Sequence, residues 1–392
     1  MSFDEIIDRR HTGSGKWDAA PGPIDPDRHI IPLSVADMEF RSPPAIRERL
    51  VQLAQEGVWG YTGPRPQYFE ALDRWYRLRH NFPIQKDWVI PTTGVVQAVY
   101  AAVRAFSREG EGVLIQTPVY HPFYRAIEGN DRRLLENPLV IRQGRYEIDF
   151  EDLEAKMKEA RLFILCNPHN PVGRVWDRDE LDRMAQLAAQ YGVFVISDEI
   201  HCDFTYGKDH IVFSHLARDR ACRHLLAFSA SKTFSLAGLN LASMVLEDPE
   251  DRDHYVKQVR RDGVNTHSSF GFAAAEAAYT LCDDWYFAML DYIQANYQAL
   301  KNFAAQEMPK LHVFDLEGTY LAWLDFRAVC QDPETLETYL NEAYLYFNQG
   351  SMFGNDGQGF ERINLACPRS LLMTSLQRLK TVYDRLVSGA DR

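Results

Sequence analysis

The sequence places a lysine, Lys232, directly after a compact apolar run and between hydroxyl side chains. The run, 225–228, is too short for a typical helix and favours a buried strand. Apolar surroundings lower the pKa of a lysine and make its amine nucleophilic, and the hydroxyls of Ser229 and Ser231 could hold a phosphate. These features predict a Schiff-base lysine for pyridoxal 5'-phosphate (PLP). The alternative is a surface lysine after a strand.

Polar side chains also follow three other short apolar runs. Helical patterns separate several of these runs, which predicts an α/β domain with a mostly parallel sheet. In such sheets ligands bind at the carboxyl ends of the strands. The residues at these ends are Tyr120 after 113–116, Asn170 after 162–165 and Asp198 after 193–196.

A further candidate for binding an anion is the stretch 92–96, which leads into a helix expected to end near 106. It combines hydroxyls, Gly94 and then Val95 at the helix start, where unpaired backbone N–H groups point outward. Many helices begin this way without a ligand, so the stretch is weak support when taken alone.

The residues at the strand ends supply what PLP needs from a protein. Asp198 could hold the pyridine nitrogen protonated, Tyr120 could stack on the ring, and Asn170 could bind the phenolic oxygen. Arg369 could grip a substrate carboxylate. Each has a structural alternative: Asp198 as a helix cap, Tyr120 as a core aromatic, Asn170 as a turn residue and Arg369 as a surface arginine. Their joint occurrence at successive strand ends favours the site.

The length of 392 residues predicts two domains. Residues 1–43 are irregular and rich in Pro and Gly, which predicts an N-terminal arm that packs on the small domain or a partner. Residues 44–283 are expected to form the large, cofactor-binding domain. Residues 284–392 are expected to form a smaller α+β domain, with a long helix over 284–306, strands over 318–325 and 361–366, and a closing helix.

The formal net charge of −12 argues against binding to nucleic acid or to an anionic membrane surface. No apolar run approaches the roughly 18 residues of a membrane span. Six cysteines without a C-x-x-C pair, and a start that lacks a secretory pattern, predict a reduced cytoplasmic protein. No metal is expected, because no carboxylate or cysteine spacing supports His121, His169, His201 and His267 as ligands.

Several motifs together resemble one family. The chain resembles the PLP-dependent enzymes of aminotransferase fold type I, and within them the MalY/PatB group of cystathionine β-lyases and cysteine-S-conjugate β-lyases. The most specific motifs are Asn-Pro-His-Asn-Pro-Val-Gly at 167–173 and Ser-Asp-Glu-Ile-His at 197–201. The others are 3–18, 35–40, 60–63, 92–96, 117–120, 231–234, 265–270, 317–320 and 366–370.

The resemblance implies a large domain with a seven-stranded, mostly parallel sheet flanked by helices, and a smaller C-terminal α+β domain. It implies the roles given above for Lys232, Asp198, Asn170, Tyr120 and Arg369.

Further contacts are implied by the resemblance alone. Ala36 would touch the substrate together with Asn170, and His201 would contact the cofactor. Tyr61 would reach the phosphate of the neighbouring subunit, which implies a homodimer with shared active sites.

From this resemblance we expect α,β-elimination from an L-amino acid that carries sulfur at Cβ, such as L-cystathionine, to pyruvate, ammonia and a thiol. Lys232 would remove the Cα proton, and Tyr120 or Tyr61 would assist the leaving sulfur. The alternatives are an aminotransferase and a PLP-binding regulatory protein. His201 and Asn240 depart from the common aminotransferase pattern, and an intact Lys232 argues against a purely regulatory role.

Overall fold

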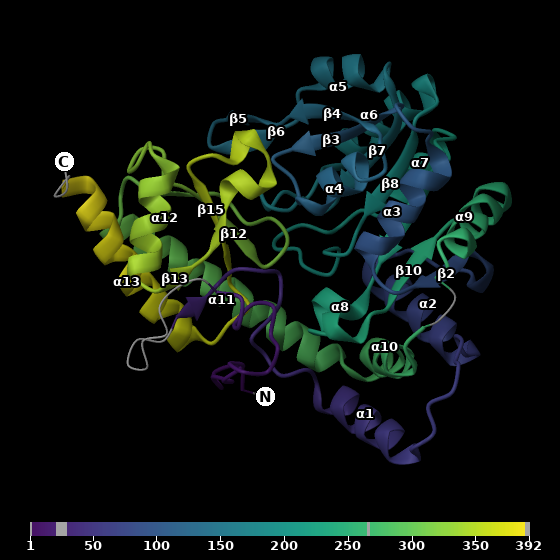
Figure 1. The fold of residues 1–392 in the computed structure, drawn as a ribbon, viewed down its shortest axis with the longest axis horizontal. Coiled ribbons are helices and arrows are strands. Elements are labelled where there is room, and N and C mark those ends of the chain that lie inside the picture. Colours follow the sequence, from purple (N-terminus) through teal and green to yellow (C-terminus); the bar gives the residue numbers. More distant parts are fainter. Residues whose placement is uncertain (1, 21–29, 265–266, 389–392) are drawn as a thin grey trace.

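The computed structural model describes residues 2–20, 30–264 and 267–388, so the predicted motif residues Asn265 and Thr266 lie outside the described part. Its larger half is built on one sheet (Figure 1). The strands are β2 (Val89–Thr92), β3 (Gly112–Thr117), β4 (Arg133–Pro138), β7 (Ala160–Cys166), β8 (Phe194–Asp198), β9 (His224–Phe228) and β10 (Ala242–Val245). They lie in the order β2-β10-β9-β8-β7-β3-β4, and only β10 runs antiparallel to its neighbours. The predicted mostly parallel, seven-stranded sheet is confirmed.

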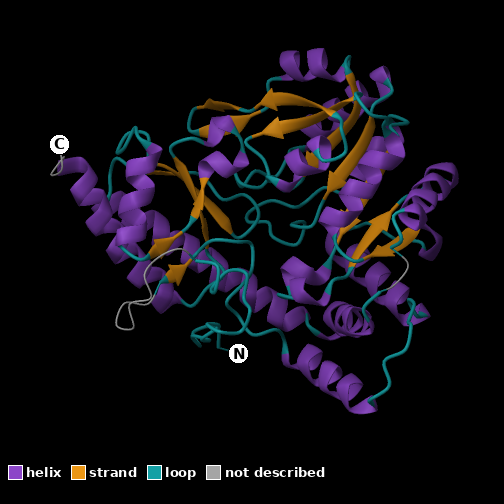
Figure 2. Cartoon of the chain, viewed as in Figure 1, coloured by secondary structure: helices purple, strands orange, loops and turns teal. Residues whose placement is uncertain are grey.

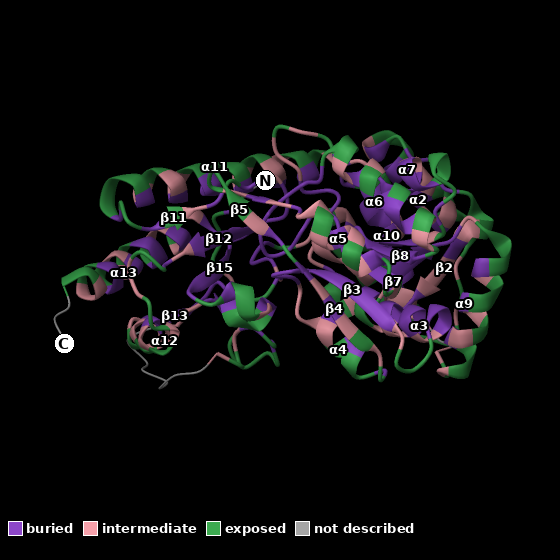
Figure 3. Ribbon diagram, turned by 90° about the horizontal axis from the view of Figure 1, so that it is seen from above, coloured by how far each residue is buried: buried purple, intermediate pink, exposed green. Residues whose placement is uncertain are grey.

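Helices cover both faces of this sheet (Figure 1). One layer consists of α3 (Val95–Phe106), α4 (Pro122–Glu128) and α9 (Pro249–Arg261). The other consists of α2 (Pro66–His80), α5 (Phe150–Met157), α6 (Arg178–Tyr191), α7 (Phe213–Asp219) and α10 (Ser269–Leu281). In β7, Leu162 and Ile164 pack into the first layer and Phe163 and Leu165 into the second. The strands are therefore buried on both sides (Figure 3), which explains their continuous apolar sequences.

The C-terminal part holds a separate antiparallel sheet, seen at the left of Figure 2. Its strands are β11 (His312–Val313), β12 (Leu321–Asp325), β14 (Asn348–Gln349) and β15 (Phe360–Asn364). The helices of this part are α11 (Asp283–Glu307), α12 (Pro333–Glu342) and α13 (Arg369–Ser388). The strand expected over 318–325 begins only at Leu321, because the chain turns at Thr319, whose φ is 68°. The predicted domain boundaries stay a prediction.

The N-terminal segment packs against both parts. Strand β1 (Ile31–Pro32) pairs in parallel with β13 (Leu345–Tyr346). Upstream of it, the fully buried Lys16 places its Nζ 2.7 Å from the carboxylate of Glu39. The remaining elements are α1 (Pro44–Glu56), the hairpin β5 (Val140–Arg142) and β6 (Arg145–Glu147), the short helix α8 (Ala230–Thr233), and the 3-10 turns η1 (Lys86–Trp88), η2 (Ala237–Leu239), η3 (Gly350–Phe353) and η4 (Asn355–Gly357).

Helix boundaries follow the signals in the sequence. Helix α1 has Pro44 in its first turn and ends at Gly57, a left-handed C-cap with a φ of 69°. In the part of the chain that the structure describes, no helix has both the length and the apolarity needed to cross a bilayer.

Candidate active site

A cavity of about 710 Å³ lies at the carboxyl ends of the parallel strands. In the strand register Cys166 of β7 lies opposite Asp198 of β8, and Asp198 lies opposite Ala227 of β9, so the ends of these three strands are adjacent. The predicted site residues that line the cavity are Ala36, Gly94, Val95, Tyr120, Asn170, Asp198, His201, Ser229, Ser231 and Lys232. Tyr61 and Arg369 do not line it.

Lys232 is held by the short helix α8 that follows β9. The hydroxyl of Ser229 caps this helix: it accepts a hydrogen bond from the Ser231 amide (3.0 Å) and donates one to the carbonyl of Leu241 (2.8 Å). The Nζ of Lys232 donates to the carbonyl of Ala36 at 2.7 Å. Burial lowers the pKa of Lys232 to about 8. A sizeable fraction of the amine is therefore neutral and nucleophilic near neutral pH.

Asp198 ends β8 and is 4% exposed. It accepts a hydrogen bond from the amide of Ile200 at 3.1 Å, and no cationic side chain of the described residues forms an ion pair with it. Burial raises the pKa of Asp198 to about 7, although the nearby charge of Lys232 opposes the rise. A buried carboxylate of this kind is stabilised by a cationic partner, and a protonated pyridine nitrogen would supply one.

The side chain of Arg362 lies behind Asn170 and is 4% exposed. Its Nη1 donates to Oδ1 of Asn170 (2.8 Å), its Nη2 donates to Oδ1 of Asn348 (2.5 Å), and its Nε has no hydrogen-bond partner. Burial lowers its pKa to about 10, so the group remains cationic near neutral pH. None of the described carboxylates forms an ion pair with it. A buried guanidinium bonded only to neutral amides lacks a counter-charge, which the carboxylate of a ligand could supply.

The structure does not bring Arg369, the residue predicted to bind the substrate carboxylate, to the cavity. The chain leaves β15 at Asn364 and starts α13 at Arg369, so the Arg369 side chain reaches α11 instead. There its Nε donates to Oδ1 of Asn296 at 2.5 Å. Arg362, inside β15, lies beside the cavity-lining residue Asn170 instead. No clear signal in the sequence pointed to it, because three of the five residues of the buried strand β15 are polar, namely Glu361, Arg362 and Asn364.

Tyr120 and His201 both line the cavity and both remain neutral. Burial raises the pKa of the Tyr120 hydroxyl, which therefore stays protonated. Burial, with the charges of Lys232 and Arg362, holds the pKa of His201 well below its usual value. Tyr120 can thus donate a proton, whereas His201 contributes an uncharged polar side chain to the lining of the cavity.

The predicted phosphate-binding residues come from neighbouring strand ends. Thr92 of β2 pairs with Ala242 of β10, and the Leu241 carbonyl accepts the Ser229 hydroxyl. This brings the start of α3 close to the start of α8. The hydroxyl of Ser229 is used in capping, so the donors left for a phosphate are the Ser231 hydroxyl and the first N–H groups of α3.

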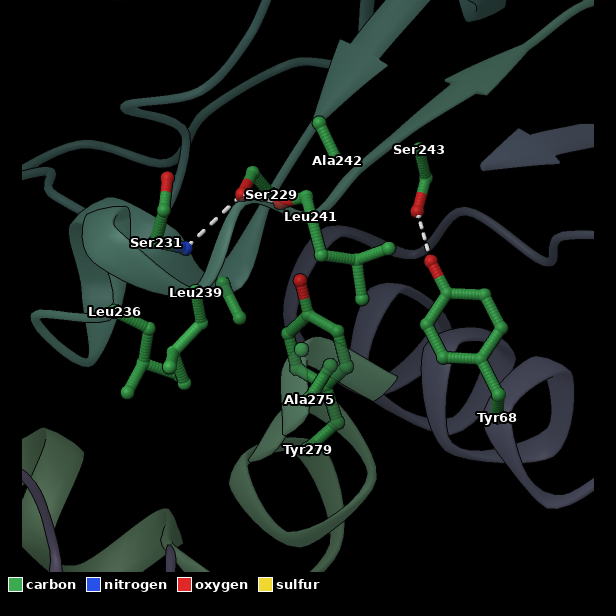
Figure 4. Close-up of a pocket in the computed structure, with 12 residues that line it drawn as sticks. Tyr68, Ser229, Ser231, Leu236, Leu239, Leu241, Ala242, Ser243, Ala275 and Tyr279 are labelled. Atoms are coloured by element: carbon green, nitrogen blue, oxygen red, sulfur yellow. Dashed lines mark hydrogen bonds between the residues drawn. The ribbon is translucent and has the colours of Figure 1, made fainter. Parts of the chain in front are cut away.

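A second, much smaller cavity lies behind this wall (Figure 4). Its volume is about 10 Å³, which is room for a single water molecule at most. Tyr68 bonds to Ser243 at one side, and the Ser231 amide bonds to the Ser229 hydroxyl at the other. This region therefore supports the wall of the large cavity and is too small to bind a cofactor.

One group of side chains in the described part has the spacing of a metal site, namely His80, Cys202 and Asp203. The Asp203 carboxylate, however, is hydrogen-bonded to His80 (2.8 Å), Trp75 (3.0 Å) and Thr233 (2.5 Å). Its oxygens are therefore occupied. The group is a buried network that anchors Thr233, the residue after Lys232.

Comparison with known proteins places these residues in a family. The family model described as aminotransferase class I and II matches residues 28–379. The chain belongs to this family. Cystathionine β-lyase PatB of Bacillus subtilis is 38% identical and covers 97% of this chain and 99% of its own length. The protein MalY of Escherichia coli is 35% identical, covering 95% of this chain and 96% of its own length.

A solved structure agrees with this assignment. Cystalysin of Treponema denticola, whose crystal structure contains a PLP cofactor, has a TM-score of 0.94 and 38% identity to this aminotransferase-family chain. The match covers 98% of this chain and 99% of cystalysin. The predicted fold type and the resemblance to the MalY/PatB group are confirmed.

The stability of this aminotransferase-family protein without cofactor should depend on the protonation of Asp198. Its folded-state pKa of about 7 exceeds the ordinary value of 3.8. The native state keeps a proton that the unfolded chain releases, so this stabilisation is full below about pH 4 and is lost as the pH rises to 7. Between pH 5 and 7 the free energy of unfolding should fall by about 2 kcal/mol in the wild type and not in Asp198→Asn.

Urea denaturation of the cofactor-free protein at the two pH values measures this difference. Saturating PLP should abolish the decline in the wild type, because a pyridinium partner keeps the carboxylate ionised. Parallel pH dependences in wild type and Asp198→Asn would contradict the assignment.

Proposed function

We propose that this chain is a PLP-dependent carbon–sulfur β-lyase that releases pyruvate, ammonia and a thiol from L-cystathionine or a related cysteine S-conjugate. The observation that carries the proposal is the buried Arg362 beside a cavity that also holds a lysine amine and an unpaired carboxylate. The relatives PatB and cystalysin, similar over nearly the whole chain, agree with the predicted lyase class and cofactor.

The residues present fit PLP. Asp198 lacks a cation, Lys232 supplies an amine, Asn170 lines the cavity, and the start of α3 offers unpaired N–H groups. When bound, PLP supplies an electron sink that stabilises negative charge at the substrate Cα.

The side chains around the cavity bind the substrate and transfer protons. Arg362 and Asn170 bind the substrate carboxylate and thereby fix the orientation of Cα. The Lys232 amine, with its lowered pKa, takes the Cα proton. The Tyr120 hydroxyl stays protonated and can give its proton to the departing sulfur. Water then completes the balance, so that cystathionine and water yield pyruvate, ammonia and homocysteine.

Product analysis tests this function. The PLP-loaded protein is incubated with L-cystathionine, with and without a 2-oxo acid. A lyase forms pyruvate and homocysteine in equal amounts, independently of the 2-oxo acid. Transfer of the amino group to the 2-oxo acid, without release of thiol, would instead establish an aminotransferase.

We also propose that the protein acts as a homodimer with shared active sites. Tyr61 is 99% exposed and lies between α1 and α2, together with the exposed Val58 and Trp59. Exposed apolar side chains that lie close together are typical of an interaction surface. A second copy that covers this segment would bring its Tyr61 to the phosphate side of the cavity.

Mixing two inactive variants tests the shared site. Lys232→Ala subunits retain Tyr61, and Tyr61→Ala subunits retain Lys232, so a hybrid dimer has one native site. Random reassociation of equal amounts after mild dissociation should restore about a quarter of the wild-type sites. Activity no higher than the sum of the two separate variants would contradict the shared site, and gel filtration of each variant controls for dimer formation.

The predicted domain division and cytoplasmic location are likewise proposals. The two separate sheets and the start of α11 at Asp283 support a boundary near 283. The cysteines, which are all unpaired, support a reducing compartment.

A further inference from the structure

The segment 35–37, here called the strap, crosses the active site in a strained conformation. Val35 has a φ of 50°, a left-handed conformation that is an outlier for a β-branched residue. Such strain persists only where the surrounding structure holds the backbone in place, and it is concentrated at functional sites. The carbonyl of the next residue, Ala36, accepts the hydrogen bond from the Lys232 amine.

Two buried asparagines of the small sheet hold the strap. The amide of Val35 donates to Oδ1 of Asn348 at 2.7 Å. The Nδ2 of Asn364 donates to the carbonyls of Val35 and Asp37, both at 2.8 Å. Within the strap, the amide of Asp37 also donates to the carbonyl of Val35 at 2.9 Å. The backbone polar groups around the strained residue are thus satisfied by side chains from another part of the fold.

Asn348 has a second role, because the same oxygen also accepts a hydrogen bond from Nη2 of Arg362. One amide oxygen therefore joins the guanidinium proposed to bind the substrate carboxylate to the strap that contacts Lys232. Asn348 is 8% exposed and sits in β14, which pairs with β15 so that Asn348 lies opposite Arg362. Loss of the Asn348 oxygen would deprive both the buried Arg362 guanidinium and the partly buried Val35 amide of a hydrogen-bond acceptor.

We propose that Asn348 is a positioning residue that couples the occupation of Arg362 to the placement of the strap. Asn348 does not touch the reacting atoms itself. A ligand carboxylate on Arg362 fixes the guanidinium, the guanidinium fixes Asn348, and Asn348 holds Val35 and the Ala36 carbonyl in register with Lys232. This inference rests on the proposed function only in requiring that Arg362 bind the carboxylate of an amino acid.

Hydrogen exchange of the full PLP-loaded protein tests the coupling. The probe is L-alanine, which has the carboxylate but no leaving group on Cβ. In the wild type, L-alanine should slow exchange in the peptide 33–40. In Asn348→Ala the peptide should exchange faster, L-alanine should no longer slow it, and the affinity for L-alanine should fall about tenfold.

Two variants separate positioning from a general loss of stability. Asn348→Asp keeps an acceptor oxygen for both donors and should restore the ligand-free protection of 33–40, while its negative charge beside Arg362 should weaken the binding of L-alanine. Asn137→Ala removes a buried side-chain amide of β4 that bonds to Asp149 and Asp152, and it should leave both the strap and the affinity for L-alanine unchanged. Should Asn348→Ala not fold, Asn348→Ser, which is too short to reach both donors, replaces it with the same expectations.

The proposal is overturned if L-alanine still slows exchange of the peptide 33–40 in Asn348→Ala or its substitute Asn348→Ser. It is also overturned if Asn137→Ala speeds exchange of this peptide and lowers the affinity for L-alanine. No turnover is needed for these readouts. A wild-type protein that binds L-alanine but forms no pyruvate from any thioether would refute the lyase function while leaving the result on Asn348 intact.

Discussion

Replacing Lys232 with alanine should lower pyruvate formation from L-cystathionine by about 10³–10⁴-fold, because the variant lacks the only amine that lines the cavity among the described residues. Its neighbours Asp198 and Asn170 remain, so substrate and cofactor should still bind. The readout is the steady-state rate of pyruvate release, measured together with the PLP content of the purified protein.

The matched control is Lys257→Ala, which removes an exposed lysine from α9, away from the cavity. It should keep the wild-type rate. Retention of more than a tenth of the activity in Lys232→Ala, with cofactor bound, would show that another group removes the Cα proton.

The second large effect is expected at Arg362. In Arg362→Ala the substrate carboxylate loses a buried, two-pronged cationic partner, and kcat/KM for L-cystathionine should fall by about 100-fold. Most of the loss should appear as a higher KM. Arg362→Lys retains the charge but not the planar fork, so its kcat/KM should fall by about tenfold.

Arg369→Ala serves as the control within the same segment, and it decides between the two arginines. Since the Arg369 side chain bonds to Asn296 in α11, its removal should change kcat/KM by less than about threefold and act mainly on stability. A larger kinetic effect from Arg369→Ala than from Arg362→Ala would favour the prediction made from the sequence over the structure.

Most of the cavity was predictable because its residues obey one rule of parallel sheets. Asn170, Asp198 and Lys232 each follow a short apolar run, and the carboxyl ends of adjacent parallel strands meet at one edge. The strand register then brings these ends together, because Asp198 lies beside Cys166 on one side and Ala227 on the other. Knowledge of local sequence was enough, since no long-range contact had to be guessed.

The same rule misled the prediction for the carboxylate-binding arginine. Arg369 follows a strand, as the other site residues do, whereas Arg362 lies within β15 and contacts Asn170 from a different sheet. Which residue of a small antiparallel sheet faces the large domain depends on how the two parts pack, and that information is absent from local patterns. The strap is a similar case, because the side chains that hold Val35, Asn348 and Asn364, are distant from it in the sequence.

Three strands of the large sheet were also missed: β4, in which polar residues flank Leu134 and Leu135, and the neighbouring strands β2 and β10. Pro91 interrupts β2, which is possible because β2 lies at the edge of the sheet, and Ser243 interrupts the short β10. Neither sequence shows a continuous apolar run. Their pairing, Ala242 opposite Thr92, is nevertheless what places the start of α3 against the cavity.

The most direct test of the central assignment is to reduce the PLP-loaded protein with borohydride and map the modified peptide by mass spectrometry. The account predicts one modified site, Lys232, at about one cofactor per chain, and a marked loss of cofactor binding in Asp198→Ala. Modification of a different lysine, or none at all in protein that retains bound PLP, would contradict it.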